Sequence, residues 1–149
     1  MDLKELYQEI ILDHGKNPRN FGKCKNFTSD AKGHNPLCGD KVHIYAQLDN
    51  EKKILDLSFE GEGCAISLAS ASILTDTLKG RDFNVAKAIT DNFLNLIKEN
   101  KLITVNSLND IQKTTLMSLS GVKDFPMRVK CATMAWHTLS SVLGNKNEN

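Results

Sequence analysis

Three cysteines and one aspartate carry most of the chemistry that this sequence offers. Cys38 and Asp40 flank Gly39 in a turn-forming stretch, and Cys64 and Cys131 each stand where a helix is expected to begin. Thiolates and carboxylates are zinc ligands, and the glycine would let the backbone turn tightly enough for Cys38 and Asp40 to face one ion. The long separations between the cysteines match no zinc-finger spacing, so spacing alone does not show that they converge. The residues predict a metal site if the fold brings them together.

Cys64 and Cys131 are also the candidates for catalytic thiols. Cys64 follows Gly63 at the predicted start of an apolar helix, where unpaired backbone N–H groups stabilise a thiolate and lower its pKa. Arg128 and Lys130 precede Cys131, and two cations would favour its thiolate as well. A small buried core residue is the alternative interpretation of each cysteine. The repeated setting at loop-to-helix junctions favours one shared site.

Composition limits the classes of partner and the cellular compartment. The 149 residues fit a single domain, 1–149, with a net charge of +1 and 6% aromatic residues, so no surface for nucleic acid is indicated. Charged residues interrupt the N-terminal segment and every apolar stretch, which predicts no signal peptide, no membrane contact and a cytoplasmic protein. Disulfides are unusual in that compartment, so the cysteines are better explained as metal ligands or nucleophiles. Cys24 lies outside every motif and is predicted to be a non-ligand thiol.

The hydrophobic pattern predicts an α+β fold, in which a small antiparallel β-sheet of about three strands packs against a set of α-helices. The predicted elements are helices at 2–13, 64–78, 82–99, 107–119 and after Pro126, and a hairpin of strands at 42–48 and 55–59. Gly15 and Pro18 are expected to end the first helix, with His14 as a cation at its carboxyl end. Residues 25–37 are expected to be irregular or weakly extended, and 144–149 a disordered tail.

Four ordered segments resemble the signature motifs of the U-type iron–sulfur cluster assembly proteins, the family that includes IscU and the N-terminal domain of NifU. They are Asp13–Asn20, Asn35–Asp40, Phe59–Ser67 and Arg128–Thr133. The similarity runs from about Leu3 to Leu143, so it covers nearly the whole chain. The resemblance implies a SufE/NifU-like fold.

Within that family the sequence is most similar to the SufU branch. Lys130 stands where the scaffold branch has a histidine before its third cysteine, and the stretch between Cys64 and Cys131 is long, as in SufU. The resemblance implies zinc held by Cys38, Asp40, Cys64 and Cys131, with Gly39, Gly63, Arg128 and Lys130 supporting the site. It also implies a zinc-dependent sulfurtransferase that accepts persulfide sulfur on Cys131 or Cys64, with Cys131 slightly favoured. The implied partners are a cysteine desulfurase of the SufS type and downstream iron–sulfur scaffold proteins.

Two alternatives stay open. The same cysteines could assemble and pass on a [2Fe–2S] cluster, with iron in place of zinc, so that the protein is a scaffold and not an enzyme; Lys130 counts against this. A purely structural zinc domain would normally use four Cys or His ligands, and Asp40 counts against that reading.

Overall fold

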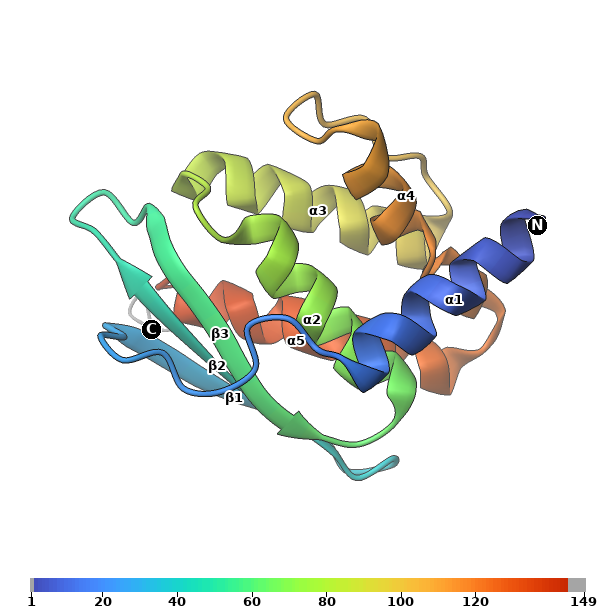
Figure 1. Cartoon of the computed structure of the whole chain (residues 1–149), viewed down its shortest axis with the longest axis horizontal. Helices are drawn as coiled ribbons and strands as arrows, with labels where there is room; N and C mark the ends of the chain where they lie inside the picture. Colours follow the sequence, from blue (N-terminus) through green and yellow to red (C-terminus); the bar gives the residue numbers. More distant parts are fainter. Residues whose placement is uncertain (1, 145–149) are drawn as a thin grey trace.

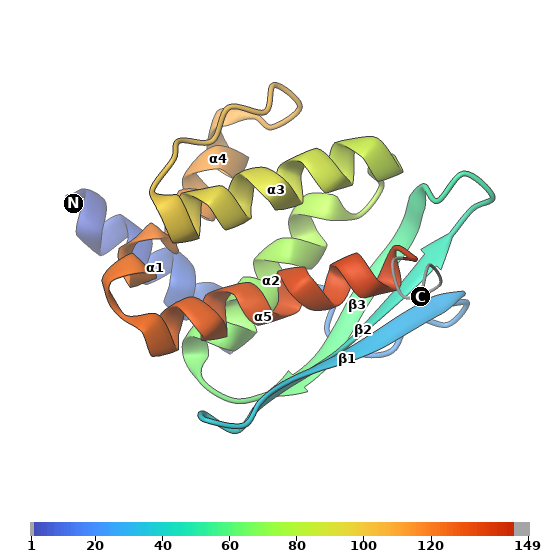
Figure 2. The same ribbon diagram turned by 180° about the vertical axis from the view of Figure 1, so that it is seen from behind.

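The computed structural model describes residues 2–144 and has two layers, a three-stranded antiparallel sheet and a group of helices over one of its faces (Figure 1). The elements, in chain order, are α1 (Leu3–Lys16), β1 (Ser29–Asn35), β2 (Asp40–Leu48), β3 (Ile54–Glu62), α2 (Ala65–Leu78), α3 (Phe83–Glu99), α4 (Asp110–Met117), the 3₁₀ helix η1 (Ser120–Asp124) and α5 (Pro126–Val142). Helix α5 packs on β1 and β2, and α2 packs on β3 (Figure 2). The predicted α+β arrangement is confirmed.

Helix α2 is the centre of the helical layer, as expected for a segment that is apolar or small nearly all round. Most of its residues are buried, and its polar side chains bond to neighbouring elements. The Ser70 hydroxyl donates to the Ala132 carbonyl of α5 at 2.5 Å and accepts the indole N–H of Trp136 at 3.0 Å. Ser72 Oγ accepts the backbone N–H of Arg19 at 2.8 Å. These bonds hold α2 against α5 and against the chain that follows α1.

The register of the strands brings the end of β1, the start of β2 and the end of β3 together at one end of the sheet. Asn35 at the end of β1 pairs with Asp40 at the start of β2, and Lys41 pairs with Glu62 at the end of β3. The segment 29–35 is therefore a regular strand and more ordered than the sequence predicted. Its side chains are polar or small and mostly not buried, so it lacks the alternating pattern of a half-buried strand. Cys38 and Asp40, two of the candidate ligands, lie at this end of the sheet.

Helix α1 continues to Lys16, beyond its predicted end, and packs against α2. A Cβ at Gly15 would stand 3.4 Å from the carbonyl oxygen of Ala65, at the first residue of α2. His14 is buried beside it, with Nδ1 2.7 Å from Ser72 Oγ. Burial lowers the pKa of His14, so the predicted role as a charged cap was wrong, and the ring is a neutral core residue.

Of the tail predicted to be disordered, 144–149, the structure describes only Gly144. Gly144 is buried and its N–H bonds to the Ser141 carbonyl at 3.1 Å, whereas 145–149 lie outside the described residues. Within residues 2–144, no helix is both long and apolar enough to cross a bilayer.

The buried His14 predicts that the fold weakens in mild acid. The unfolded chain takes up this proton near pH 6.5, whereas the folded chain resists it, so the free energy of unfolding falls as the pH drops below that value. His14→Gln should lose less stability between pH 7 and pH 5 than the wild type, measured by urea unfolding of the chelator-treated, reduced protein. The exposed His34 supplies the control, because His34→Gln should behave as the wild type. An equal loss in the wild type and His14→Gln would contradict the assignment.

Candidate metal centre

The four predicted ligands come from four different parts of the chain and lie near one another at one end of the sheet. Cys38 lies in the turn between β1 and β2, Asp40 is the first residue of β2, Cys64 is the N-cap of α2, and Cys131 lies in the second turn of α5. The turn is held by Asn35, whose carbonyl accepts the backbone N–H groups of Cys38 at 3.2 Å and Gly39 at 2.8 Å.

The ligand atoms of Cys38, Asp40 and Cys131 are close enough to share one ion, and Cys64 lies beside this group, against Asp40. Cys131 Sγ lies 3.6 Å from Cys38 Sγ, and Cys64 Sγ lies 3.7 Å from Asp40 Oδ2. Ligand atoms of Cys38, Asp40 and Cys131 all lie within 4.8 Å of one another. In a tetrahedral zinc site, two sulfurs are about 3.8 Å apart and a sulfur and an oxygen about 3.6 Å. Two thiols and a carboxylate at these separations fit a zinc ion, with Cys64 next to Asp40 as the fourth predicted ligand.

Asp40 is the buried anchor of the site. Its side chain has no exposed surface, and its Oδ1 accepts the backbone N–H of Cys64 at 2.9 Å. Gly63 lies directly against it, at a φ of +140°, and a Cβ at that position would overlap the Asp40 carboxyl group. The predicted supporting role of Gly63 thus has a steric basis, since only a glycine leaves room for the carboxylate. Gly39, at a φ of +73°, supplies the left-handed residue of the turn.

Cys64 caps the N-terminus of α2, as the sequence predicted. Its sulfur accepts the backbone N–H of Ser67 at 3.4 Å, and the Ser67 hydroxyl donates to the Cys64 carbonyl at 3.0 Å. The side chain of Cys64 is half-buried, and so is that of Cys38. Both residues therefore keep part of their surface accessible to solvent, unlike Cys131.

Cys131 is fully buried, and its pKa is raised. The main cause is burial, and the hydrogen bonds with Asp40, Cys38 and Cys64 act in the same direction. Arg128 and Lys130 are both exposed. In the chain without a metal, their expected lowering of the Cys131 pKa is outweighed by the effect of burial, which raises it.

Cys24 lies apart from this group, as predicted for a non-ligand. It is buried, its thiol pKa is raised chiefly by burial, and it contacts Ser58. It belongs to no set of possible metal ligands among the described residues.

Asn35 and Ser67 are two supporting residues that the sequence did not single out. Asn35 holds the Cys38 turn through its backbone carbonyl. The backbone N–H of Ser67 donates to the sulfur of Cys64. The Asn-Pro pair at 35–36 is a turn signal that could have indicated the first. A serine three residues into a helix is too common to indicate the second.

Comparison with known proteins identifies the family of this chain. The family described as "NifU-like N terminal domain" matches residues 6–132. This chain belongs to that family. The predicted resemblance to the U-type proteins is therefore confirmed.

Individual relatives cover almost the whole chain. The zinc-dependent sulfurtransferase SufU of Bacillus subtilis (strain 168) is 39% identical over 93% of this chain and 89% of its own length. The iron–sulfur cluster assembly scaffold protein IscU of Streptococcus pyogenes serotype M1 is 33% identical over 95% of this chain and 84% of its own. The crystal structure of FiSufU from Fervidobacterium islandicum AW-1, described as a SUF-system scaffold protein, has a TM-score of 0.78 at 35% identity, covering 93% of this chain and 97% of its own.

The contact between Gly63 and Asp40 predicts that the site tolerates no side chain at residue 63. Gly63→Ala would both strain a backbone at a φ of +140° and push on the carboxyl group of Asp40. We expect a loss of about 1–3 kcal/mol in the free energy of unfolding and weaker metal binding, measured by urea unfolding and by metal titration. Gly121→Ala is the control, because nothing lies within 4 Å of a Cβ there. Equal behaviour of the two variants would contradict the steric argument.

Proposed function

We propose that this protein is a zinc-dependent sulfur carrier in iron–sulfur cluster assembly. It would hold one zinc ion on Cys38, Asp40, Cys64 and Cys131 and accept persulfide sulfur from a cysteine desulfurase. The observation that carries the proposal is the meeting of the buried Asp40 carboxylate with the thiols of Cys38 and Cys131, and the position of the Cys64 thiol beside that carboxylate. The zinc-dependent sulfurtransferase name of the Bacillus subtilis relative supports it.

The donor set itself favours zinc with one exchangeable ligand. Three sulfurs suit a borderline-soft ion such as zinc, and a carboxylate oxygen is the hardest and most readily exchanged member of the set. When bound, the zinc ion would keep the thiols deprotonated at neutral pH, offsetting the effect of burial on Cys131. Asp40 keeps its hydrogen bond to the Cys64 N–H through Oδ1, so Oδ2 is the oxygen available to the metal.

The exposure of the thiols decides which of them can receive sulfur. Cys131, slightly favoured from the sequence, has no exposed surface, so a persulfide on another protein cannot reach it in this conformation. Cys38 and Cys64 are half-buried and lie at the rim of the site. The acceptor in this proposal is therefore Cys64 or Cys38, and Cys131 serves as a buried metal ligand.

The transfer itself is a thiol–persulfide exchange. The acceptor thiolate attacks the outer sulfur of the donor persulfide, a new S–S bond forms, and the S–S bond of the donor breaks. The donor cysteine leaves as a thiolate, and the transferred sulfur keeps its proton. One sulfane sulfur passes between two cysteines, so no external oxidant or reductant is needed.

Exposed apolar residues near the site offer a face for the sulfur donor. Leu37 precedes Cys38 and is 63% exposed, while Phe125 and Met127 are exposed at the start of α5. Arg128 and Lys130 add positive charge beside them. We place the docking of a SufS-type desulfurase here, and a downstream scaffold protein would approach the same thiols to take the sulfur away.

A scaffold for a [2Fe–2S] cluster is the second candidate. The same three cysteines and Asp40 would serve it, and the Streptococcus pyogenes relative is named a scaffold protein. Lys130, at the position of the scaffold-branch histidine, favours the sulfur carrier instead.

Metal content separates the two functions. Protein purified without added metal should be colourless and contain about one zinc per chain, measured by elemental analysis and visible absorption. Asp40→Ala should weaken zinc binding by roughly tenfold to a hundredfold or more. Asp82→Ala is the control, since the Asp82 side chain makes no cap hydrogen bond and lies away from the site. Brown protein with stoichiometric iron and sulfide would favour the scaffold, and equal zinc affinity in the two variants would remove Asp40 from the ligand set.

Sulfur transfer is measured with a cysteine desulfurase. This protein should raise the turnover of the desulfurase by removing its persulfide, and peptide mapping by mass spectrometry should find one added sulfur on Cys64 or Cys38. Cys131→Ser should abolish the stimulation because the metal site would lose a ligand, whereas Cys24→Ser should leave it intact. Persulfide found on Cys131 would show that the buried thiol is the acceptor. Equal behaviour of Cys24→Ser and Cys131→Ser would remove the three-cysteine site from the transfer.

A further inference from the structure

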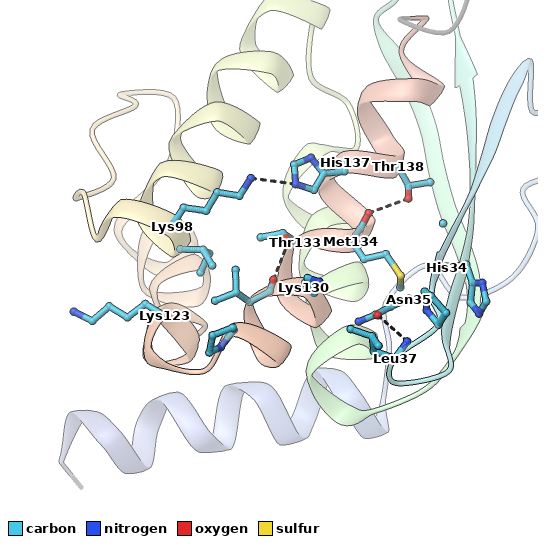
Figure 3. A pocket seen from close by; sticks show the side chains of 15 residues that line it. His34, Asn35, Leu37, Lys98, Lys123, Lys130, Thr133, Met134, His137 and Thr138 are labelled. Carbon is cyan, nitrogen blue, oxygen red and sulfur yellow. Dashed lines mark hydrogen bonds between the residues drawn. The ribbon is translucent and has the colours of Figure 1, made fainter.

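A groove of about 870 Å³ lies beside the metal site, between α5, the end of α3 and the turn that follows β1 (Figure 3). Its lining includes the apolar side chains of Leu37, Val129 and Met134. Leu37 belongs to the turn that carries Cys38, and Val129 lies two residues before Cys131. The groove and the metal site therefore share two structural elements, but none of the four candidate metal ligands lines the groove.

Three lysines give the groove a positive charge. Lys98, Lys123 and Lys130 line it from α3, η1 and α5, and all three are exposed. Within the part of the chain that the structure describes, no aspartate or glutamate lines the groove and none of these lysines forms an ion pair. An anionic ligand would meet three unneutralised ammonium groups there.

His137 holds one of these lysines over the groove. The ammonium group of Lys98 lies 3.4 Å from His137 Nε2, and Figure 3 shows the two side chains reaching toward each other. Burial, and then the charge of Lys98, lowers the pKa of His137, so the ring is neutral at physiological pH and accepts the hydrogen bond. The hydrogen bond thus orients Lys98 over the groove.

A buried amide on the opposite wall leaves one donor unused. The Oδ1 atom of Asn35 accepts the backbone N–H of Leu37 at 3.2 Å, but its Nδ2 is buried without a hydrogen-bond partner. Asn35 is only 6% exposed and lines the groove. Buried donors are nearly always paired, so an oxygen supplied by a ligand would complete this one once the amide turns toward the groove.

We propose that this groove binds an acidic peptide segment of a protein partner. A large apolar side chain of the peptide would cover Val129 and Met134, its carboxylates would face Lys98, Lys123 and Lys130, and an oxygen would accept from Asn35. A free inorganic anion would match the charge but leave the apolar lining uncovered, so a peptide fits the groove better. The inference concerns binding alone and does not depend on zinc or on sulfur transfer.

The test is selection of peptides from a random display library on the intact protein as purified. Enriched peptides should carry at least two acidic residues beside a large apolar residue. The binding of a labelled enriched peptide should weaken at least tenfold for the double variant Lys98→Glu, Lys123→Glu. The double variant Lys53→Glu, Lys87→Glu reverses the same number of charges at exposed lysines outside the groove and should bind as the wild type. Circular dichroism and thermal unfolding check that each variant is folded.

The position of the bound peptide is read by NMR. The methyl group of Met134 and the ring of His137 should shift on titration, and a version of the peptide with glutamine and asparagine in place of its acids should bind at least tenfold more weakly. Equal weakening in the two double variants, enrichment of neutral or basic peptides, or no enrichment would overturn the proposal. Displacement of the peptide by millimolar inorganic phosphate at constant ionic strength would show an anion site instead. Because none of these readouts involves sulfur transfer, a failure here would leave the proposed function untouched.

Discussion

The hydrogen bond from the Cys64 N–H to the carboxylate of Asp40 joins the sheet to the start of the central helix, and the rest of the site depends on it. A carboxylate without exposed surface needs such a partner, because an unpaired charge in the protein interior is costly. Gly63 makes the contact possible by leaving the space beside Asp40 empty. The start of α2 is therefore held to the sheet by a backbone N–H and a buried carboxylate.

The same bond explains how one carboxylate can serve both the fold and a metal. Its Oδ1 atom is occupied by the backbone, which fixes the plane of the carboxyl group and turns Oδ2 toward the cysteines. Groups that orient a ligand in this way commonly contribute to metal affinity. Cys131 is brought to the anchored helix by a second link, because Ser70 of α2 bonds to α5 at Ala132 and Trp136. Two separate links thus bring α2 to the sheet and α5 to α2.

The parts of the molecule with a strong local signal could be predicted from the sequence. The start of α2 at Cys64 follows from two glycines and a nearly uncharged helix, and the β2–β3 hairpin follows from alternation around a turn. Strand β1 could not be recognised, because an edge strand of polar and small residues takes its register from β2. The burial of His14 could not be predicted, because α1 packs on α2, and its hydrogen-bond partner Ser72 in α2 is far away in the sequence.

That the ligands lie together was predicted from the family motifs and not from their spacing, because only the fold brings Cys38 next to Cys131. The thiol exposures could not be predicted either. Cys131 looked activated because Arg128 and Lys130 adjoin it in sequence, but α5 turns its thiol inward and their side chains outward. The lysine groove was hidden for a similar reason, because α3, η1 and α5 each contribute a single cation to it.

Trp136 gives the molecule an optical reporter of its own. It is the only tryptophan in the chain, it is fully buried, and its ring stacks on Phe93 with centroids 4.3 Å apart. Its indole N–H is bonded to Ser70, so the single fluorophore is attached to α2 as well as to α5. Those two helices carry Cys64 and Cys131. Any separation of the helices that pulls these thiols apart would change the polarity around the indole, so its emission registers the integrity of the site without a label.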